Sequence, residues 1–259
     1  MRIALGLEYD GSDYRGWQRQ SNGPSVQSAA EEAISKVADH PVLLTCAGRT
    51  DAGVHAIGQV VHFDTDSIRD NRAWILGSNS NLPPTVTVLW ALQVDDAFHA
   101  RFKAEWRSYR YIILNRFTRA SLHSRYATWW HRPLDAERMH AAAQALVGRH
   151  DFSAFRASEC QAKTPIKTLH QLTITRSGEW IYLDVRADGF LHHMVRNFAG
   201  VLTLVGTGEQ PPEWPQRVLE SRDREQGGIT APPNGLYLTG VGYPPAFNIP
   251  VPAAPPAFG

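Results

Sequence analysis

The feature that most constrains this fold is the repeated change between strand-like and helix-like hydrophobic spacing in both halves of the chain. Residues 3–9 alternate apolar and small or polar side chains, as a strand does. Ser25 then precedes apolar residues spaced along one face of a helix. Residues 168–175 and 180–187 flank a Ser-Gly pair, the pattern of a β-hairpin. This mixture predicts an α+β protein with mainly antiparallel sheets, since a doubly wound sheet would alternate strands and helices strictly.

The chain is long enough to form two domains, because single hydrophobic cores stop growing near its length of 259 residues. We expect an N-terminal α+β domain over residues 1–105 and a C-terminal α+β domain over residues 106–243. Residues 244–259 are rich in Pro and Ala and lack periodicity, so they form either a draped or a disordered tail. The remaining strands are predicted at 42–46, 59–63, 86–94, 102–114 and 236–242, and the helices at 71–79, 135–147, 192–205 and 213–221.

Composition excludes several classes of protein. Two cysteines, Cys46 and Cys160, are too few for a secreted disulfide framework in a chain of this length. The N-terminus lacks the basic start and apolar run of a signal peptide. No stretch of about 18 apolar residues is present to span a membrane. These features predict a cytoplasmic protein.

Basic residues are concentrated in one segment, although the net charge of the chain is only +1. Residues 101–132 contain eight basic side chains and one acid, Glu105, and eight Trp, Tyr and Phe residues lie among them. Such a basic, aromatic stripe is typical of a nucleic-acid groove, and a solvated Arg-rich strand face is the alternative. The residues that we expect to contact RNA are Arg101, Arg107, Arg110, Arg116 and Arg119.

The densest group of chemically useful residues is the loop Ala47–His55, in which two glycines bracket Arg49 and Asp51. Glycine allows backbone to approach a ligand closely, and an Asp on such a loop can act as nucleophile or general base. Arg49 could hold phosphate or stack on a displaced base. Spacing alone favours a tight turn locked by an ion pair between Arg49 and Asp51, and a catalytic loop is the alternative.

Other candidate sites in the sequence are weak. His192 and His193 are adjacent, and adjacent residues on a helix point in different directions, so we expect no metal site there. Gly206-Thr207-Gly208 lacks the third glycine of a dinucleotide-binding fingerprint, and no glycine loop continues into Gly-Lys-Ser/Thr. Carboxylate chemistry beside an Arg-rich, aromatic surface is what remains.

At these residues the sequence resembles the bacterial TruA-type family of tRNA pseudouridine synthases, from Ile3 to about Tyr243. The Pro-rich end falls outside the resemblance, and Pro84-Thr85-Val86 is a small departure from it. The segment Cys46–His55, continuing through Gly58–Phe63, resembles the catalytic signature of the family. The other segments that carry the resemblance are Glu8–Ser12, Gly16–Gln20, Ser25–Gln27, Phe98–Phe102, Tyr109–Tyr111, Phe190–Asn197 and Gly235–Leu238.

The resemblance implies a pseudouridine synthase fold, in which two subdomains with mainly antiparallel sheets flank a central cleft. It implies that Asp51 is the catalytic carboxylate and that Tyr109 packs on the target base. Arg49 would help to extrude the nucleotide and take its place, and Arg196 would pair with Asp51 and keep it charged. The family acts on the 3′ side of the tRNA anticodon stem-loop, at positions 38, 39 and 40. It is homodimeric, with tRNA lying across both subunits, and uses no metal or organic cofactor.

Physical chemistry is consistent with these roles. The reaction breaks the N1–C1′ bond, rotates the uracil and rejoins it through C5, so the base must first leave its helix at a cost of a few kcal/mol. Stacking on an aromatic side chain offsets about 1–3 kcal/mol of that cost. Two alternatives remain open: a pseudouridine synthase acting on another RNA, and an RNA chaperone on the same scaffold without turnover.

We predict that activity survives treatment with EDTA followed by dialysis, because the sequence shows no metal-ligand spacing. The measurement is isomerisation before and after chelation, with tRNA folding checked separately. Loss of turnover that zinc or magnesium restores would show that the His192–His193 pair was misread.

Overall fold

The computed structural model describes residues 1–251 and 254–258, which form two compact units. The first unit is Met1–Trp106 with the described residues of Tyr237–Pro255. The second is Arg107–Leu236 with the described residues of Pro256–Gly259. The division expected at 105/106 lies beside the first of these limits. Residues 237–243, which the sequence analysis placed in the second domain, group with the first unit, because their strand pairs with a strand of that unit.

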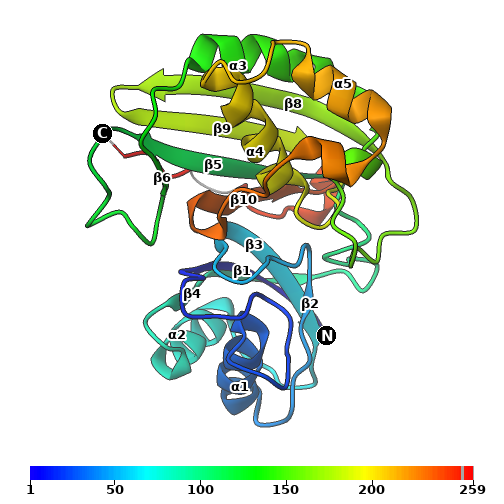
Figure 1. Ribbon diagram of the computed structural model, residues 1–259. Coiled ribbons are helices and arrows are strands. Elements are labelled where there is room, and N and C mark those ends of the chain that lie inside the picture. Colours follow the sequence, from blue (N-terminus) through cyan, green and yellow to red (C-terminus); the bar gives the residue numbers. More distant parts are fainter. Residues whose placement is uncertain (252–253, 259) are drawn as a thin grey trace. The chain divides into compact units, whose positions relative to one another are not determined.

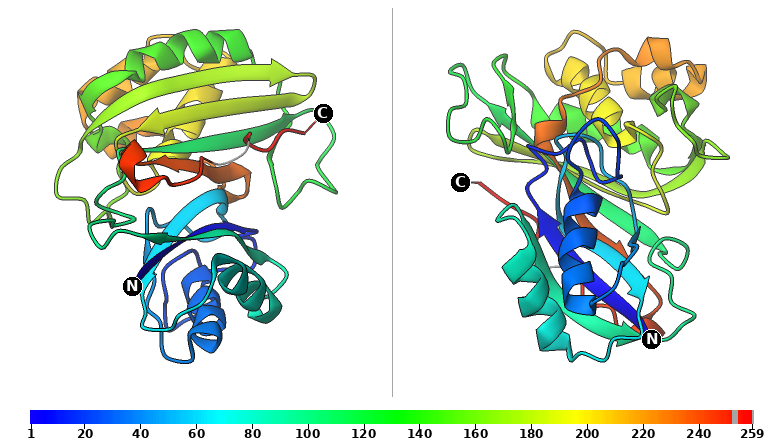
Figure 2. Two further views of the ribbon diagram at one scale, coloured as in Figure 1. Left: turned by 180° about the vertical axis from the view of Figure 1, so that it is seen from behind. Right: turned by 90° about the horizontal axis from the view of Figure 1, so that it is seen from below.

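The first unit has a sheet with two helices, α1 and α2, on one face (Figures 1 and 2). Its central strand β1 pairs antiparallel with β3 and β4, and β10 pairs parallel with β3 at Tyr237 and Leu238. The short strand β2 pairs antiparallel with β3. The elements are β1 (Arg2–Tyr9), α1 (Val26–Ala38), β2 (Thr45–Cys46), β3 (His55–Asp64), α2 (Asn71–Asn81), β4 (Val86–Val94) and β10 (Leu236–Gly242).

Capping residues fix the helices of the first unit where the sequence predicts them to begin. The Ser25 hydroxyl accepts a hydrogen bond from the Ser28 amide and so satisfies a free N–H of the first turn of α1. Asp39, in the left-handed conformation with φ 59°, ends the helix. Asp70 caps α2 in the same way through the amide of Ala73.

The second unit repeats this arrangement with an antiparallel sheet in the order β5–β9–β8–β7. A further strand, β6, pairs parallel with β5. The helices α3, α4 and α5 lie on one face of this sheet (Figure 2). The elements are β5 (Trp106–Asn115), β6 (Thr128–Trp130), α3 (Ala136–Ala143), β7 (Gly148–Asp151), β8 (Ile166–Ser177), β9 (Trp180–Ala187), α4 (Met194–Gly206) and α5 (Trp214–Ser221).

Both units are α+β with mainly antiparallel strands, which confirms the predicted fold class. The hairpin turn at Gly178 is also confirmed, with φ 57° at the glycine. Single-turn 3-10 helices complete the structure: η1 (Gln144–Leu146), η2 (Ser153–Phe155), η3 (Arg224–Gly227), η4 (Pro233–Gly235) and η5 (Pro245–Phe247). Across residues 1–251 and 254–258, every helix is too short or too polar to cross a membrane.

Some predicted boundaries are wrong for local reasons. The strand expected from Phe102 begins at Trp106, because His99 holds the chain in a turn. Its Nδ1 accepts hydrogen bonds from the amides of Arg101 and Phe102, and its carbonyl accepts one from Lys103. The helix expected over residues 135–147 becomes 3-10 after Ala143. The strand expected over residues 42–46 is regular only at Thr45–Cys46.

The described end of the Pro-rich tail packs on the second unit. The Arg110 guanidinium donates a hydrogen bond of 3.0 Å to the carbonyl of Pro256. The Phe258 ring lies against the rings of Trp180 and His123, with centroids 5.1 and 5.0 Å away. Residues 254–258 are therefore draped rather than free in solution, and residues 252, 253 and 259 lie outside the described part of the chain.

We predict that His62 makes the first unit sensitive to acid. Burial, helped by His99 and Arg2, lowers the pKa of His62 to about 4, and its Nδ1 accepts a hydrogen bond from the Ala100 amide. The folded-state pKa lies below the unfolded value of about 6.5, so protons bind the unfolded chain preferentially. Stability from this group is present above about pH 6.5 and is lost as the pH falls towards 4.

The measurement is the free energy of unfolding in urea at several pH values in this window. His62 contributes a slope of at most about 1.4 kcal/mol per pH unit. His62→Gln keeps an acceptor for the amide but does not titrate, so its unfolding free energy should fall less steeply. Equal slopes for the two proteins would contradict the assignment.

Candidate active site

The loop between β2 and β3 holds two of the sequence-predicted site residues, Arg49 and Asp51. Its start is fixed by the Ala47 amide, which donates a hydrogen bond of 2.8 Å to the carbonyl of Val60. A turn follows Asp51, whose carbonyl accepts from the Val54 amide at 3.1 Å. The Asp51 side chain is half-buried and that of Arg49 is exposed. The loop is thus fixed at both ends and presents a carboxylate and a guanidinium two residues apart.

A segment near the N-terminus clamps this loop. The Trp17 amide donates a hydrogen bond of 3.0 Å to the carbonyl of Thr50, and the Trp17 side chain is fully buried. Gly16 adopts φ 95°, and a Cβ atom there would lie 2.7 Å from the Thr50 carbonyl oxygen. Only glycine meets both conditions, so Gly16 is what allows the two segments to approach each other this closely.

Buried side chains hold the same loop from beneath. The hydroxyls of Tyr9 and Thr50 are hydrogen-bonded at 2.8 Å. The Gln59 side-chain amide donates to the carbonyl of Gly48 at 2.6 Å. These bonds satisfy loop groups that would otherwise be buried without partners. Sequence reasoning gave Tyr9, Thr50 and Gln59 no role, although all three lie in segments that carry the family resemblance.

His55 closes the loop on the side of β3. Its Nδ1 lies 3.1 Å from the Gly11 amide nitrogen and 3.2 Å from the Asp10 carboxylate. The imidazole stacks on Tyr237 of β10, with ring centroids 4.7 Å apart and planes at 26°. The last residue of the loop is therefore packed against β10, the final strand of the first unit.

Tyr109, the predicted base-packing residue, lies on β5 of the second unit. It is 8% exposed, and its ring meets the ring of Phe190 edge to face, with centroids 5.0 Å apart. It stands opposite Val185 of β9. Its surroundings are therefore largely apolar, which suits a ring that packs against a flat, hydrophobic base face.

Arg196 lies in the first turn of α4 and is half-buried. Its Nε donates a hydrogen bond of 2.8 Å to the carbonyl of Ala231, and its own carbonyl accepts one of 3.2 Å from the Ala231 amide. These two bonds fix the start of the side chain and the direction of the guanidinium.

The prediction that His192 begins this helix is wrong. His193 has φ 62°, a left-handed conformation that α-helix does not contain, and α4 begins at Met194. The two imidazoles do not point apart as they would on a helix, because their centroids are 3.9 Å apart.

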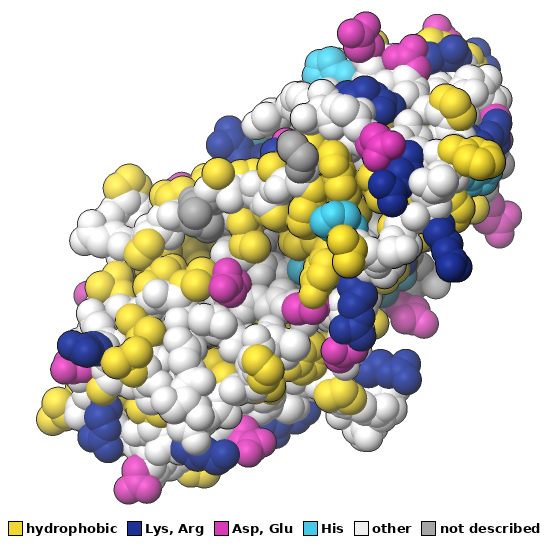
Figure 3. Space-filling view, turned by 90° about the vertical axis from the view of Figure 1, so that its left-hand side faces the viewer, with side chains coloured by type: hydrophobic (Ala, Val, Ile, Leu, Met, Phe, Trp, Pro, Cys, Tyr) yellow, Lys and Arg dark blue, Asp and Glu magenta, His cyan; other side chains and the backbone are white. Residues whose placement is uncertain are grey.

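The basic segment is less positive than its sequence indicates, because acidic side chains from other segments pair with it. Arg110 Nε and Nη2 both lie 2.7 Å from the carboxylate of Asp184, its partner across β5 and β9. Arg116 lies 3.3 Å from Glu179. On the face drawn in Figure 3, basic and acidic side chains are interspersed rather than separated into patches. Among the other members, the Arg107 guanidinium donates to the Asp188 carbonyl, Arg132 pairs with Glu209, and Arg101 and Arg119 are exposed.

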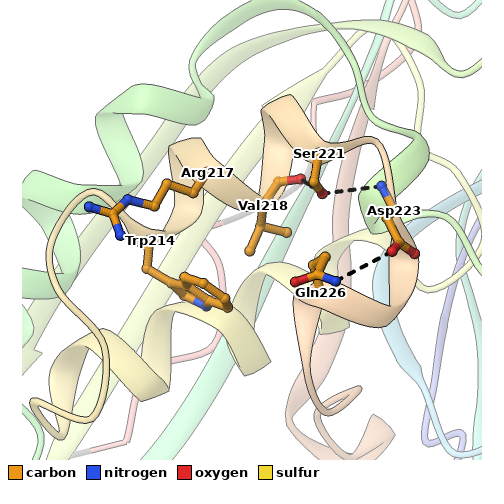
Figure 4. Close-up of a pocket in the computed structure, with 6 residues that line it drawn as sticks. All are labelled: Trp214, Arg217, Val218, Ser221, Asp223 and Gln226. Atoms are coloured by element: carbon orange, nitrogen blue, oxygen red, sulfur yellow. Dashed lines mark hydrogen bonds between the residues drawn. The ribbon is translucent and has the colours of Figure 1, made fainter.

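A cavity of about 230 Å³ lies elsewhere in the second unit, between α5 and η3 (Figure 4). Hydrogen bonds from the Asp223 amide to the Ser221 hydroxyl and from the Gln226 side chain to the Asp223 carboxylate close one side of it. It contains none of the residues that the sequence predicted for the site. Its lining residues are Trp214, Arg217, Val218, Ser221, Asp223 and Gln226.

The chain belongs to the tRNA pseudouridine synthase family, whose model matches residues 7–103 and 142–244. Both the loop with Asp51 and the start of α4 with Arg196 lie in the matched segments, whereas Tyr109 lies between them. Curated relatives named tRNA pseudouridine synthase A extend the match to almost the whole chain. The protein of Nitrosococcus oceani is 56% identical over 96% of both chains. Those of Pseudomonas aeruginosa and Coxiella burnetii are 58% and 53% identical over 96% of this chain and 88% and 95% of their own.

We predict that Gly16→Ala lowers the isomerisation rate by more than tenfold, because the added methyl group would displace Thr50 and, with it, the loop that holds Asp51. The control is Gly178→Ala, since Gly178 also has positive φ but has no atom within 4 Å of the added position. Gly178→Ala should lose about 1 kcal/mol of unfolding free energy from backbone strain, and Gly16→Ala should lose more, because its methyl group also meets the Thr50 carbonyl oxygen. Equal rates for the two variants would mean that the clamp does not position the loop.

Proposed function

We propose that this protein converts uridine to pseudouridine in tRNA, with Asp51 as the catalytic carboxylate. The observation that carries the proposal is the match to tRNA pseudouridine synthase A over nearly the entire chain, at 53–58% identity. The loop with Arg49 and Asp51, clamped by Gly16 and Trp17, supports it, because a reaction at one carboxylate needs that group held in a fixed position.

The chemistry needs one ionised carboxylate beside the ribose and the base. Uracil leaves C1′ through cleavage of the N1–C1′ bond, turns, and forms a bond from C5 to C1′, after which the proton on C5 is lost and one is gained at N1. Atoms and electrons balance within the nucleotide. Asp51 acts either as a nucleophile that holds C1′ or as a base that removes a sugar proton, and both roles need the anion.

The other proposed residues serve extrusion of the base and the charge of Asp51. Arg49, exposed on the loop, enters the helix position that the extruded nucleotide leaves. Tyr109 packs on the extruded base. Arg196 supplies the positive charge that keeps Asp51 ionised, since an adjacent guanidinium lowers the pKa of a carboxyl by about 1–3 units.

The proposed substrate is the 3′ side of the anticodon stem-loop, at tRNA positions 38, 39 and 40. We further propose a cytoplasmic homodimer in which one tRNA lies across both subunits, and a reaction without cofactor. Arg101 and Arg119 are exposed members of the basic segment and the first candidates for phosphate contacts. Arg107, Arg110 and Arg116, which contact protein groups, are further candidates.

Two experiments separate this function from its alternatives. Sequencing of pseudouridine positions in RNA from a deletion strain distinguishes tRNA from another RNA substrate. Release of tritium from tRNA labelled at C5 of uridine distinguishes an enzyme from an RNA chaperone, because only isomerisation removes that hydrogen. Absence of tritium release from folded tRNA would refute the proposal.

We predict that Asp51→Asn abolishes isomerisation and leaves the Kd for tRNA within about threefold of wild type. An amide cannot replace a nucleophile or base, whereas phosphate contacts come from cationic side chains elsewhere. Tritium release and filter binding measure the two properties on the same preparation. Turnover within tenfold of wild type would remove Asp51 from the central role.

We predict that tRNA affinity falls linearly with salt on a log–log scale, because each neutralised phosphate releases counterions. Arg119→Gln should reduce that slope by about one unit if Arg119 meets a phosphate. Arg110→Gln is the matched comparison, and its slope should stay closer to wild type because Asp184 already pairs with that guanidinium. A salt-independent affinity would show that this segment is not the RNA surface.

A further inference from the structure

Four consecutive residues of the second unit, Ile229–Pro232, are each held by a different group, and we call them the 229–232 segment. Thr230 is hydrogen-bonded through its hydroxyl, Ala231 through both its amide and its carbonyl, and Pro232 through its carbonyl. Ile229 lies against the backbone of α4. These contacts hold the 229–232 segment in one conformation, although it lies outside helix and strand. The segment can therefore hold the side chains that it contacts in place.

One contact of the segment is Arg196. The Ala231 carbonyl accepts from Arg196 Nε at 2.8 Å, and the Ala231 amide donates to the Arg196 carbonyl at 3.2 Å. The guanidinium is planar and its five N–H donors are in a fixed fork. The position of the Ala231 carbonyl therefore sets the plane in which the other four donors of Arg196 lie.

A polar network holds Thr230, the residue that precedes Ala231. Arg224 Nη2 donates to Thr230 Oγ1 at 2.7 Å and to Asn197 Oδ1 at 3.0 Å, and the Thr230 hydroxyl donates to the same Asn197 oxygen at 2.7 Å. Asn197 is 1% exposed, and its Nδ2 donates to the carbonyl of Phe155 at 2.8 Å. Arg224 Nη1 also donates to the carbonyl of Gly228. The network fixes Thr230 against the residue that follows Arg196 in α4.

Two further contacts complete the arrangement. A Cβ atom on Gly200 would lie 2.0 Å from the Ile229 carbonyl oxygen, so the segment touches the helix backbone one turn beyond Arg196. At the other end, the Tyr111 hydroxyl donates to the Pro232 carbonyl at 2.8 Å. Burial raises the pKa of Tyr111, so this hydroxyl keeps its proton and remains a donor.

We propose that Arg224, Thr230 and Asn197 are positioning residues for Arg196, acting through the Ala231 carbonyl. The inference rests on the proposed role of Arg196 as the partner of Asp51. A guanidinium that turns freely spends only part of its time in the orientation that a carboxylate needs, whereas one held at Nε is oriented before substrate arrives. The network thus contributes to the chemical step without touching the substrate.

The test uses Thr230→Val, which keeps the shape of the side chain and removes its hydroxyl. The single-turnover rate constant should fall by about threefold to tenfold, the effect of losing one hydrogen bond that holds a reactive geometry. The Kd for tRNA should stay within twofold, and Thr230→Ser should restore the rate.

The matched control is Thr207→Val at the far end of α4, where the hydroxyl bonds Leu204 and Glu209, and its rate should equal wild type. Should Thr230→Val fail to fold, Arg224→Gln takes its place with the same expectations.

A pH–rate profile and a double variant separate positioning from general destabilisation. Arg196→Met should lose activity at pH 7 and regain part of it at higher pH, because without its partner the pKa of Asp51 rises. Thr230→Val should shift the profile in the same direction by a smaller amount. Added to Arg196→Met, it should cause no further loss.

The outcomes distinguish this inference from the proposed function. If Thr230→Val lowered the rate constant by the same factor in the wild-type and Arg196→Met backgrounds, the positioning role would be overturned and the role of Arg196 would stand. A wild-type profile for Arg196→Met would overturn both.

Discussion

The approach of Gly16 to the Thr50 carbonyl is the contact on which the candidate site depends. The loop with Asp51 has no regular secondary structure, so its conformation depends on contacts with neighbouring residues. The Trp17 amide binds the Thr50 carbonyl from one side, and the Tyr9 hydroxyl binds its side chain from beneath. A side chain at residue 16 would separate the two segments. Contacts with neighbouring segments thus fix the position of the loop, as the proposed reaction at the Asp51 carboxylate requires.

The second unit reaches the same end by another route. Arg196 and Tyr109 lie on regular elements, a helix and a strand, so their positions follow from packing. Long side chains need additional contacts to be oriented, and Arg196 has them in the Ala231 carbonyl. In both units the residues proposed for chemistry are few, and more residues are used in holding them.

The sequence predicted elements well where their signals are local. Ser25 marks the start of α1, and the Ser-Gly pair marks the hairpin of β8 and β9, because a cap and a turn depend on neighbouring residues. It could not predict that β10 joins β3, since parallel pairing of residues far apart leaves no local trace. For the same reason, Asp184 was not recognised as the partner of Arg110. The importance of Asp51 came from the family resemblance, since spacing alone favoured a simple turn.

The pairing of β10 with β3 has a consequence for synthesis of the chain on the ribosome. The sheet of the first unit lacks one strand until residues 236–242 have been made, although β3 ends at Asp64. At about 5–20 residues per second, roughly 170 residues take on the order of 10–35 s to follow. During that time the edge of β3 that β10 will cover is an unpaired strand edge, open to other chains. The sheet of the first unit is therefore completed only after residues 236–242 have been made, so its folding cannot proceed strictly from the N-terminus.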